Sequence, residues 1–587
     1  MTGNWDLSYI YKSFDDPAIA ADFSLIRESC AAMTRLLEQP GETVETLEKA
    51  VALSETVSDR MQRLFLYSEL TLSVDATNRD AAALISRAEA LNTECGLCGS
   101  ALVRYVGHLP DLEAAIASSE KLQAVAFALR EMKEQTAHLP DEKAEPWLLK
   151  LHRSGAGAFS HLRDELDSTL TVNYRGEELS LAAVRGLAYD ADPQVRRDAY
   201  EAELAAYAKI ELPMSYCLNA VKLEARTMAE AKGYGSVLEM TLKQNRTDRE
   251  TLDAMWTAIR EYLPDFRRYM RTKARILGHD NGLPFYDLFA PVGRGGKAWT
   301  PEETKEKLVT EMSRFTPKMG EFIANAFDSD WIDLYPHAGK TGGAFCAGAT
   351  FADRSLIMTN FTGSWSDVCT LVHELGHAWH NRCTAGLPHL LLNVPMMLAE
   401  TASIFNETML GHQVMTTASE DERFTLLETS LSDAAQVLVD IYSRYLFETE
   451  VVDTCDDHFM SAEQLKDAML RAQEASYGNG LDPDCRHPWM WACKSHYYSA
   501  GLNFYNFPYA FGQLFARGLF AVYQEKGDAF VPEYCALLRA CGSDTVANVA
   551  ARAGIDVRSV DFWRRSLETY RRDIDEFCRL SQTLYGV

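Results

Sequence analysis

The 587-residue sequence lacks the features that would direct it into or across a membrane. Its first residues have neither the basic nor the apolar region of a signal peptide, and no uninterrupted apolar run approaches the roughly 20 residues of a membrane-spanning helix. Its 13 cysteines, an odd number, follow no disulfide-like spacing. We therefore expect reduced thiols in a cytoplasmic protein with no membrane partner.

Positive charge is also scarce. The chain has 58 lysines and arginines against 84 aspartates and glutamates, a formal net charge of −26, and it contains no lysine- or arginine-rich block. Such a surface repels nucleic acid and anionic lipid, so we expect no nucleic-acid partner. Neutral or cationic ligands remain compatible with it.

Two short motifs are incomplete. The single C-x-x-C pattern, Cys95 to Cys98, lacks the second pair of a zinc ribbon, and we interpret both cysteines as buried thiols in a helix. The glycine-rich stretch from Gly293 to Gly296 lacks the lysine and serine of a phosphate-binding P-loop, and we interpret it as a connector.

The most informative stretch covers residues 373–377, which read H-E-L-G-H. Residues four apart on a helix lie one above the other, so the imidazoles of His373 and His377 can reach one metal ion. Glu374 lies beside that metal without needing to bind it, which suits a general base for an attacking water. The alternative is a buried helix whose histidines are satisfied by hydrogen bonds.

A catalytic zinc usually has three protein ligands and an open fourth position. His380 lies on the same helix face, but about 10 Å along the axis from His373, too far to share the ion. We predict Glu400 as the third ligand, on a second helix that begins near Pro395 and closes at Gly411. Spacing alone does not separate Glu400 from an ordinary surface glutamate.

Two acidic residues are candidates for the second shell around the metal. Glu407 lies seven residues after Glu400, on nearly the same helix face, and can accept a hydrogen bond from a ligand imidazole. Asp367 is the competing candidate. Its alternative role is to cap the H-E-x-x-H helix together with Ser364.

From about residue 15 to 275, apolar residues recur at intervals of three and four, which predicts a succession of helices. Residues 343–351 and 355–361 instead predict a β-hairpin that leads directly into the H-E-x-x-H helix. Its exposed edge could hold an extended peptide through backbone hydrogen bonds, so we predict Gly343, Ala344 and Phe345 as substrate-binding residues. A purely structural hairpin is the alternative.

The motif and the segment after it resemble the oligoendopeptidase F branch of the thimet oligopeptidase and neurolysin family of zinc metallopeptidases. The resemblance rests on residues 373–380, followed by 400–407. Further similar stretches are Trp5 to Ser8, Phe14 to Pro17, Lys340 to Cys346 and Met358 to Gly363. Residues 20–240 match only as generic helices.

The resemblance implies a mainly α, two-lobed helical metallopeptidase with a deep substrate channel and a small β-sheet next to the zinc-binding helix. We expect an N-terminal helical domain over 1–110, a helical segment over 111–200 that completes the N-terminal lobe, and a catalytic domain over 201–587. The resemblance also implies one Zn²⁺ per chain, bound by His373, His377 and Glu400.

The family places a histidine and tyrosines opposite the metal, which corresponds here to His496, Tyr505 and Tyr509. The two tyrosines are four residues apart and can present both hydroxyls from one helix face, where a phenol can donate a hydrogen bond to an oxyanion. Aromatic core packing is the alternative. The chain departs from thimet-type members in a longer spacing after His496 and in Gly512, where they carry another tyrosine.

These features predict a zinc-dependent endopeptidase that hydrolyses short unstructured oligopeptides. A zinc carboxypeptidase on a similar helical fold would need a cationic clamp for the substrate carboxylate, and no arginine stands out for that task. A non-catalytic peptide-binding protein would have no use for an intact Glu374. The sequence predicts neither the oligomeric state nor the cleavage preference.

Overall fold

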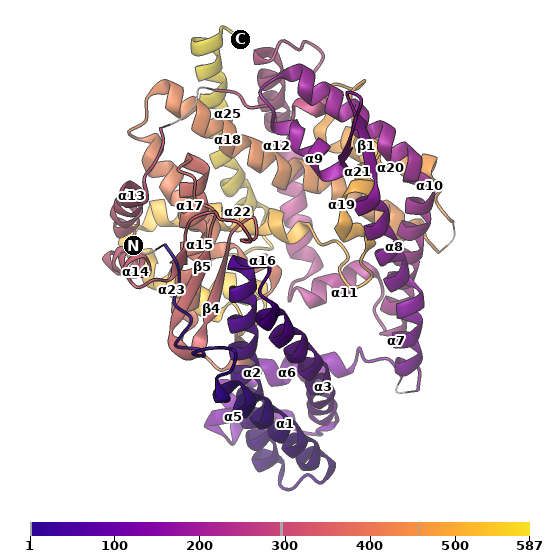
Figure 1. Ribbon diagram of the computed structural model, residues 1–587, viewed down its shortest axis with the longest axis vertical. Coiled ribbons are helices and arrows are strands. Elements are labelled where there is room, and N and C mark those ends of the chain that lie inside the picture. The colour runs from indigo at the N-terminus through magenta and orange to yellow at the C-terminus, as the bar shows by residue number, and fades with distance from the viewer. Residues whose placement is uncertain (1–2, 142, 294–296, 457) are drawn as a thin grey trace. The chain divides into compact units, whose positions relative to one another are not determined.

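The computed structural model describes residues 3–141, 143–293, 297–456 and 458–587 (Figure 1). Most of these residues are helical and the strands are few and short, which confirms the predicted mainly α fold class. The last three residues of the predicted connector, 294–296, lie outside the described part of the chain. No helix in the described part is both long and apolar enough to span a bilayer.

The chain divides into two compact units, and each is built from three stretches of sequence. The first unit comprises Met1–Leu139, Lys297–Gln413 and Val522–Gly554. The second unit comprises Pro140–Gly296, Val414–Ala521 and Ile555–Val587. The domain boundaries expected after residues 110 and 200 stay a prediction.

The first unit begins with three long helices that pack against one another, α1 (Pro17–Glu38), α2 (Thr43–Val74) and α3 (Arg79–His108). Its other helices are α4 (Leu112–Ala117), α5 (Glu120–Ala124), α6 (Ala126–Thr136), α13 (Pro301–Ser313), α14 (Pro317–Asp328), α15 (Trp365–Thr384), α16 (Met396–Ala399), α17 (Thr401–Met415), α23 (Phe530–Ala540) and α24 (Val546–Ala551). Cys95 and Cys98 lie in α3 as free thiols, half-buried rather than buried.

A three-stranded sheet in the first unit confirms the predicted hairpin. Its order is β3-β5-β4, with β3 (Ile332–Asp333) parallel and β4 (Phe345–Ala349) antiparallel to the central β5 (Arg354–Met358). The turn contains Asp353 in the left-handed conformation, at φ 49°. Both strands are shorter than predicted, and β5 ends seven residues before α15 begins at Trp365.

The N-terminal segment packs on this hairpin. The rings of Trp5 and Phe345 lie 6.3 Å apart, and those of Tyr9 and Phe351 also lie 6.3 Å apart. Buried apolar residues of α1, α2 and α3 continue the same core up to Leu356 in β5. Burial of this apolar surface ties the sheet, and thereby the start of α15, to the helices at the N-terminus.

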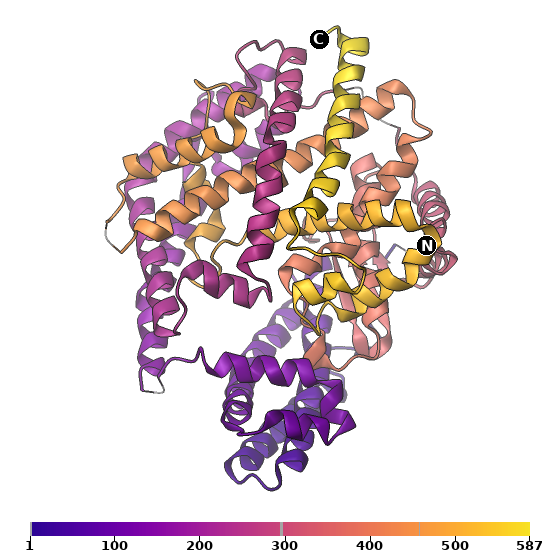
Figure 2. The same cartoon turned by 180° about the vertical axis from the view of Figure 1, so that it is seen from behind.

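The second unit is built on long amphipathic helices. Its main helices and strands are α7 (Glu145–Ser154), α8 (Ala156–Thr169), β1 (Thr171–Tyr174), β2 (Glu177–Ser180), α9 (Leu181–Gly186), α10 (Pro193–Ala231), α11 (Val237–Gln244), α12 (Arg249–Ile276), α18 (Glu420–Ala434), α19 (Ile441–Thr454), α20 (Ala462–Tyr477), α21 (Met490–Cys493), α22 (Phe507–Lys526) and α25 (Val560–Tyr585). Figure 2 shows α25 in yellow beside α12, and apolar side chains at helical spacing join the two.

Candidate metal centre

Helix α15 carries the H-E-x-x-H sequence, and its start is fixed by a complete capping box. The Ser364 hydroxyl accepts a hydrogen bond from the Asp367 backbone N–H at 3.1 Å, and the Asp367 carboxylate accepts one from the Ser364 backbone N–H at 3.0 Å. The helix ends at Thr384, just before the left-handed Gly386. His373 and His377 therefore lie one turn apart on a well-defined helix.

Gly376 allows a second helix to cross α15 at close range. A Cβ atom at this position would lie 2.5 Å from the Cα of Ser403 and 2.6 Å from the carbonyl oxygen of Ala402, both backbone atoms of α17. Only glycine permits this approach without displacing one helix. The crossing brings Glu400, which lies between α16 and α17 at φ −91° and ψ 6°, next to the two histidines.

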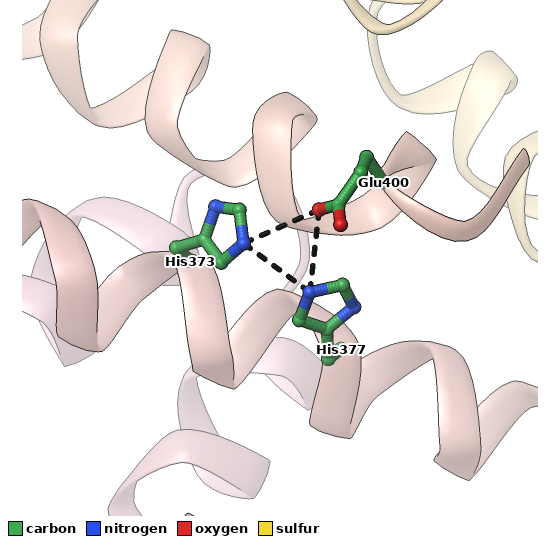
Figure 3. A group of neighbouring side chains, drawn as sticks. All are labelled: His373, His377 and Glu400. Atoms are coloured by element: carbon green, nitrogen blue, oxygen red, sulfur yellow. Dashed lines mark hydrogen bonds and ion pairs between the residues drawn. The ribbon is translucent and has the colours of Figure 1, made fainter. Parts of the chain in front are cut away.

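Three donor atoms meet at this crossing (Figure 3). The Nε2 atoms of His373 and His377 lie 3.2 Å apart, and Oε2 of Glu400 lies 3.2 Å from the first and 3.3 Å from the second. Ligands about 2.0–2.1 Å from a tetrahedral zinc ion lie about 3.3–3.4 Å from one another. The triangle therefore has the size that a tetrahedral metal ion requires.

His373 is held from its other ring nitrogen. Its Nδ1 donates a hydrogen bond to Oε1 of Glu407, on α17, while the other ring nitrogen, Nε2, faces Oε2 of Glu400. Burial opposes protonation of His373, but the hydrogen bonds to the two carboxylates outweigh it and raise the pKa of the imidazole to about 10. The Glu407 carboxylate thus lies against the ring nitrogen of His373 that faces away from the donor triangle, and its role beside a bound metal stays a prediction.

Glu400 is oriented by a neighbour on its own helix turn. The Ser403 hydroxyl lies 2.7 Å from Oε2 of Glu400 and 3.0 Å from its backbone carbonyl oxygen. Burial raises the pKa of the Glu400 carboxyl, but hydrogen bonds from His373 and His377 prevail and hold it well below its usual range. The carboxylate is therefore ionised, as a metal ligand must be.

Glu374, the residue after His373 on α15, is buried beside the two histidines. The residue is 6% exposed, and its Oε2 has no hydrogen-bond partner among the residues that the structure describes. Burial raises the pKa of its carboxyl, although the nearby His373 and His377 oppose the shift. A buried carboxylate oxygen without a partner is uncommon, and the role of Glu374 as a base stays a prediction.

The other acidic candidate, Asp367, is engaged in the helix cap. Besides the Ser364 N–H, its Oδ2 accepts hydrogen bonds from the backbone N–H groups of Thr362 and Gly363 and from the Thr362 hydroxyl, at 2.8–2.9 Å. Burial raises the pKa of this carboxyl, but these donors outweigh it and lower the pKa. A direct role of Asp367 beside the metal ligands stays a prediction.

The predicted substrate-binding residues lie at the start of β4, which is an edge strand of its sheet. Gly343 and Ala344 precede the strand, and Phe345 is its first residue. The Gly343 carbonyl oxygen accepts a hydrogen bond from the Asn360 side chain at 2.9 Å. The sheet therefore presents an edge, and its use by a peptide stays a prediction.

His496, Tyr505 and Tyr509 come together within the second unit. The His496 and Tyr505 rings stack with centroids 5.8 Å apart, and the two tyrosine hydroxyls lie 2.9 Å from each other. Tyr505 precedes α22, which begins at Phe507, so the expectation of one shared helix face is wrong although the hydroxyls meet. Burial lowers the pKa of His496 to about 3, and a role of the three opposite the metal stays a prediction.

Sequence reasoning missed the contributions of Gly376 and Ser403. Gly376 was part of the quoted motif, but its role depends on where α17 crosses, which spacing does not reveal. Ser403 carries a weak signal, because a small hydroxyl three residues after a candidate ligand can reach it on the same helix turn. His380, by contrast, binds the Leu538 carbonyl oxygen at 3.1 Å and is not part of the donor set, as predicted.

Two histidines on one helix turn, a carboxylate from a crossing helix and a buried glutamate beside them define a metallopeptidase-type centre on a helical fold. The model of Peptidase family M3 matches residues 186–569, and the chain belongs to this family. It is therefore a metalloendopeptidase that acts on peptides, which confirms the predicted enzyme class.

Relatives and solved structures agree with the family. The chain is 23% identical to Oligopeptidase PepF of Bacillus subtilis over 97% of its own length and 86% of the relative's, and 24% identical to the plasmid Oligoendopeptidase F of Lactococcus lactis over 98% and 97%. The structure of oligoendopeptidase-F from Enterococcus faecium has a TM-score of 0.72 at 20% identity and covers 96% of this chain and 99% of that one. A structure from Chlamydophila abortus reaches 0.85 at 22% identity and covers 98% of both chains. The resemblance to oligoendopeptidase F is confirmed.

Proposed function

We propose that this metalloendopeptidase uses one zinc ion, bound by His373, His377 and Glu400, to hydrolyse short unstructured oligopeptides in the cytoplasm. The observation that carries the proposal is the donor triangle, whose edges of 3.2, 3.2 and 3.3 Å match tetrahedral zinc coordination. Two histidines and one carboxylate form a common catalytic zinc set and leave a fourth position open. The names of the relatives, oligopeptidase and oligoendopeptidase, support oligopeptides as the substrate class.

His373, His377 and Glu400 would hold the zinc ion, which would supply a Lewis acid to polarise the scissile carbonyl and acidify the attacking water. Glu374 accepts the proton of that water and returns it to the leaving amine. Burial raises the pKa of its carboxyl, which favours holding the proton between the two transfers. Glu407 keeps the His373 ring in place through Nδ1.

Two further groups complete the proposed site. Tyr505, Tyr509 and His496 stabilise the negative charge that develops on the carbonyl oxygen, and the two tyrosine hydroxyls lie within hydrogen-bond distance of each other. The edge of β4 from Gly343 to Phe345 binds the peptide backbone. No observation favours a carboxypeptidase or a non-catalytic binding protein.

The test is hydrolysis of internally quenched peptides blocked at both ends, with zinc content measured on the same samples. Wild-type enzyme should cleave internally. Glu374→Gln should keep one zinc per chain and lose about 10²–10⁴-fold in rate, because the base is lost while the metal stays. Glu321→Gln, exposed on α14, is the matched control and should keep full activity. Strict dependence on a free C-terminus, or full activity of Glu374→Gln, contradicts the proposal.

A further inference from the structure

A cavity of about 350 Å³ lies entirely within the second unit. It is bounded by residues from α9, α10 and α21 and by the segment around Phe285. Ligand pockets typically measure about 300–1,000 Å³, so this cavity suits a small molecule. Aromatic rings form much of its wall, among them Phe285, Phe289 and Tyr200.

His487 lines this cavity, with Nε2 in a long ion pair with Glu203 and Nδ1 without a partner in the described part of the chain. The residue is 1% exposed, and neither nitrogen has a hydrogen-bond partner among the described residues. The nearest carboxylate oxygen, Oε1 of Glu203, lies 3.4 Å from Nε2, and the Phe285 ring lies 5.1 Å from the imidazole. Buried polar groups are almost always paired, so this imidazole indicates a ligand atom in the cavity.

The cavity also has one cation more than its carboxylates neutralise. Arg185 pairs with Glu203 at 3.1 Å, and Arg196 pairs with Asp287 at 2.7 Å. Lys494 has no ion pair within the described part of the chain.

Positive charges around the cavity act on two carboxyl groups, those of Asp440 and Glu203. Burial lowers the pKa of the Lys494 ammonium and Asp440 opposes this shift, but the Asp440 carboxylate is itself paired with Arg444. Burial raises the pKa of the Glu203 carboxyl, but the charges of His487, Arg185 and Lys494 outweigh it and lower the pKa. The cavity therefore favours a negative charge.

The backbone beside the cavity is unusual. Gln436, which lines it, belongs to the π-helical segment Ala435–Asp440 between α18 and α19. Such segments are rare and occur frequently at functional sites, because the widened turn redirects side chains.

We propose that this cavity binds a small aromatic carboxylate. Its carboxylate pairs with Lys494 and accepts a hydrogen bond from His487, while its ring packs against Phe285 and Phe289. The site goes beyond the proposed function, since none of its residues belongs to the metal centre.

The probe is 3-phenylpropionate, titrated calorimetrically into zinc-loaded enzyme, with the neutral isostere 3-phenylpropanamide as the comparison ligand. The acid should bind saturably, and the amide at least about tenfold more weakly. Lys494→Met should weaken binding of the acid about tenfold or more, the effect of one buried charged hydrogen bond. Lys209→Met, which removes an exposed lysine of α10 outside the cavity, should leave the affinity unchanged.

A second variant tests the cavity in case Lys494→Met does not fold. A Cβ added at Gly186, one of the lining residues, meets no atom within 4 Å, so Gly186→Leu adds bulk at the cavity wall without a clash. It should abolish binding while the unfolding temperature stays near that of wild type. Absence of saturable binding, equal binding of the amide, or unchanged affinity in both variants overturns the proposal.

The metal centre could itself bind a carboxylate, and removal of zinc separates the two sites. Binding at the cavity persists after chelation, whereas binding that disappears with zinc and ignores Lys494→Met belongs to the metal centre and overturns the proposal. Absence of peptide hydrolysis would contradict the proposed function and leave the result at the cavity unaffected.

Discussion

Nδ1 of His373 donates a hydrogen bond to the carboxylate of Glu407, 34 residues further along the chain. The bond turns Nε2 toward Glu400 and His377, and it fixes the plane of the ring. A donor triangle with edges close to those of tetrahedral coordination therefore depends on a residue that does not bind the metal.

Replacement of Glu407 should loosen the metal without removing a ligand. Glu407→Ala leaves the His373 ring free to rotate, and we expect zinc affinity to fall about 10–100-fold, as for other partners of metal-bound histidines. Competition with a zinc indicator measures it. Thr408→Ala removes only a hydroxyl that binds the Ile404 carbonyl oxygen of the same helix and should leave the affinity unchanged. Equal affinities of Glu407→Ala and wild type would show that packing alone holds the ring.

Gly376→Ala should separate the two helices of the centre. The added Cβ would lie 2.5–2.6 Å from backbone atoms of α17, which cannot rotate away as a side chain can. We expect a loss of about 1–3 kcal/mol in the free energy of unfolding and reduced zinc content, because Glu400 moves with α17. Denaturant titration and metal analysis report the two effects.

Gly411→Ala provides the matched control for that substitution. Gly411 lies within α17, and a Cβ there meets no atom within 4 Å. Alanine is a better helix former than glycine by roughly 0.5–1 kcal/mol, so this variant should be neutral or slightly more stable. If both alanine variants behaved alike, helix propensity rather than the close approach would explain Gly376.

The parts of this centre that follow local helix rules could be predicted from the sequence. Residues four apart share a face, which gave the His373–His377 pair, and a serine three residues before an aspartate gave the cap. Glu407 follows Glu400 by seven residues, so its place near the ligands was also predictable. The family resemblance supplied Glu400, which spacing alone left undecided.

The rest depends on contacts between segments far apart in the sequence. The second helix was expected to run from Pro395 to Gly411, but it breaks at Glu400 and continues to Met415. That break turns the Glu400 carboxylate toward α15, and no local preference of glutamate encodes it. The close crossing at Gly376 likewise depends on tertiary packing, which overrides local propensity.

Zinc should stabilise the fold through the same three ligands. A ligand that binds only the folded state adds roughly 4 kcal/mol at a concentration 1,000 times its Kd. We expect thermal unfolding of the chelated enzyme to shift to higher temperature on zinc addition, and Glu400→Gln to remove most of the shift. Glu321→Gln should keep it. A full shift in Glu400→Gln would exclude this carboxylate as a ligand.

His380 should make stability depend on pH independently of the metal. Its ring is buried and its Nε2 lies 3.1 Å from the Leu538 carbonyl oxygen, and burial lowers the pKa of the imidazole to about 4. The unfolded chain, with a pKa near 6.5, binds the proton more readily, so the contribution is complete above pH 6.5 and is lost as pH falls toward 4. A shift of this size corresponds to roughly 3 kcal/mol.

His380→Gln keeps a donor for Leu538 and cannot titrate. The difference in free energy of unfolding between wild type and this variant should therefore narrow or reverse as pH falls from 6.5 toward 4. Both proteins share the metal ligands, whose own titration cancels in the difference. His108→Gln, at an exposed position in α3, is the control variant measured over the same pH range. A constant difference for His380→Gln would mean that folding does not shift the pKa of His380.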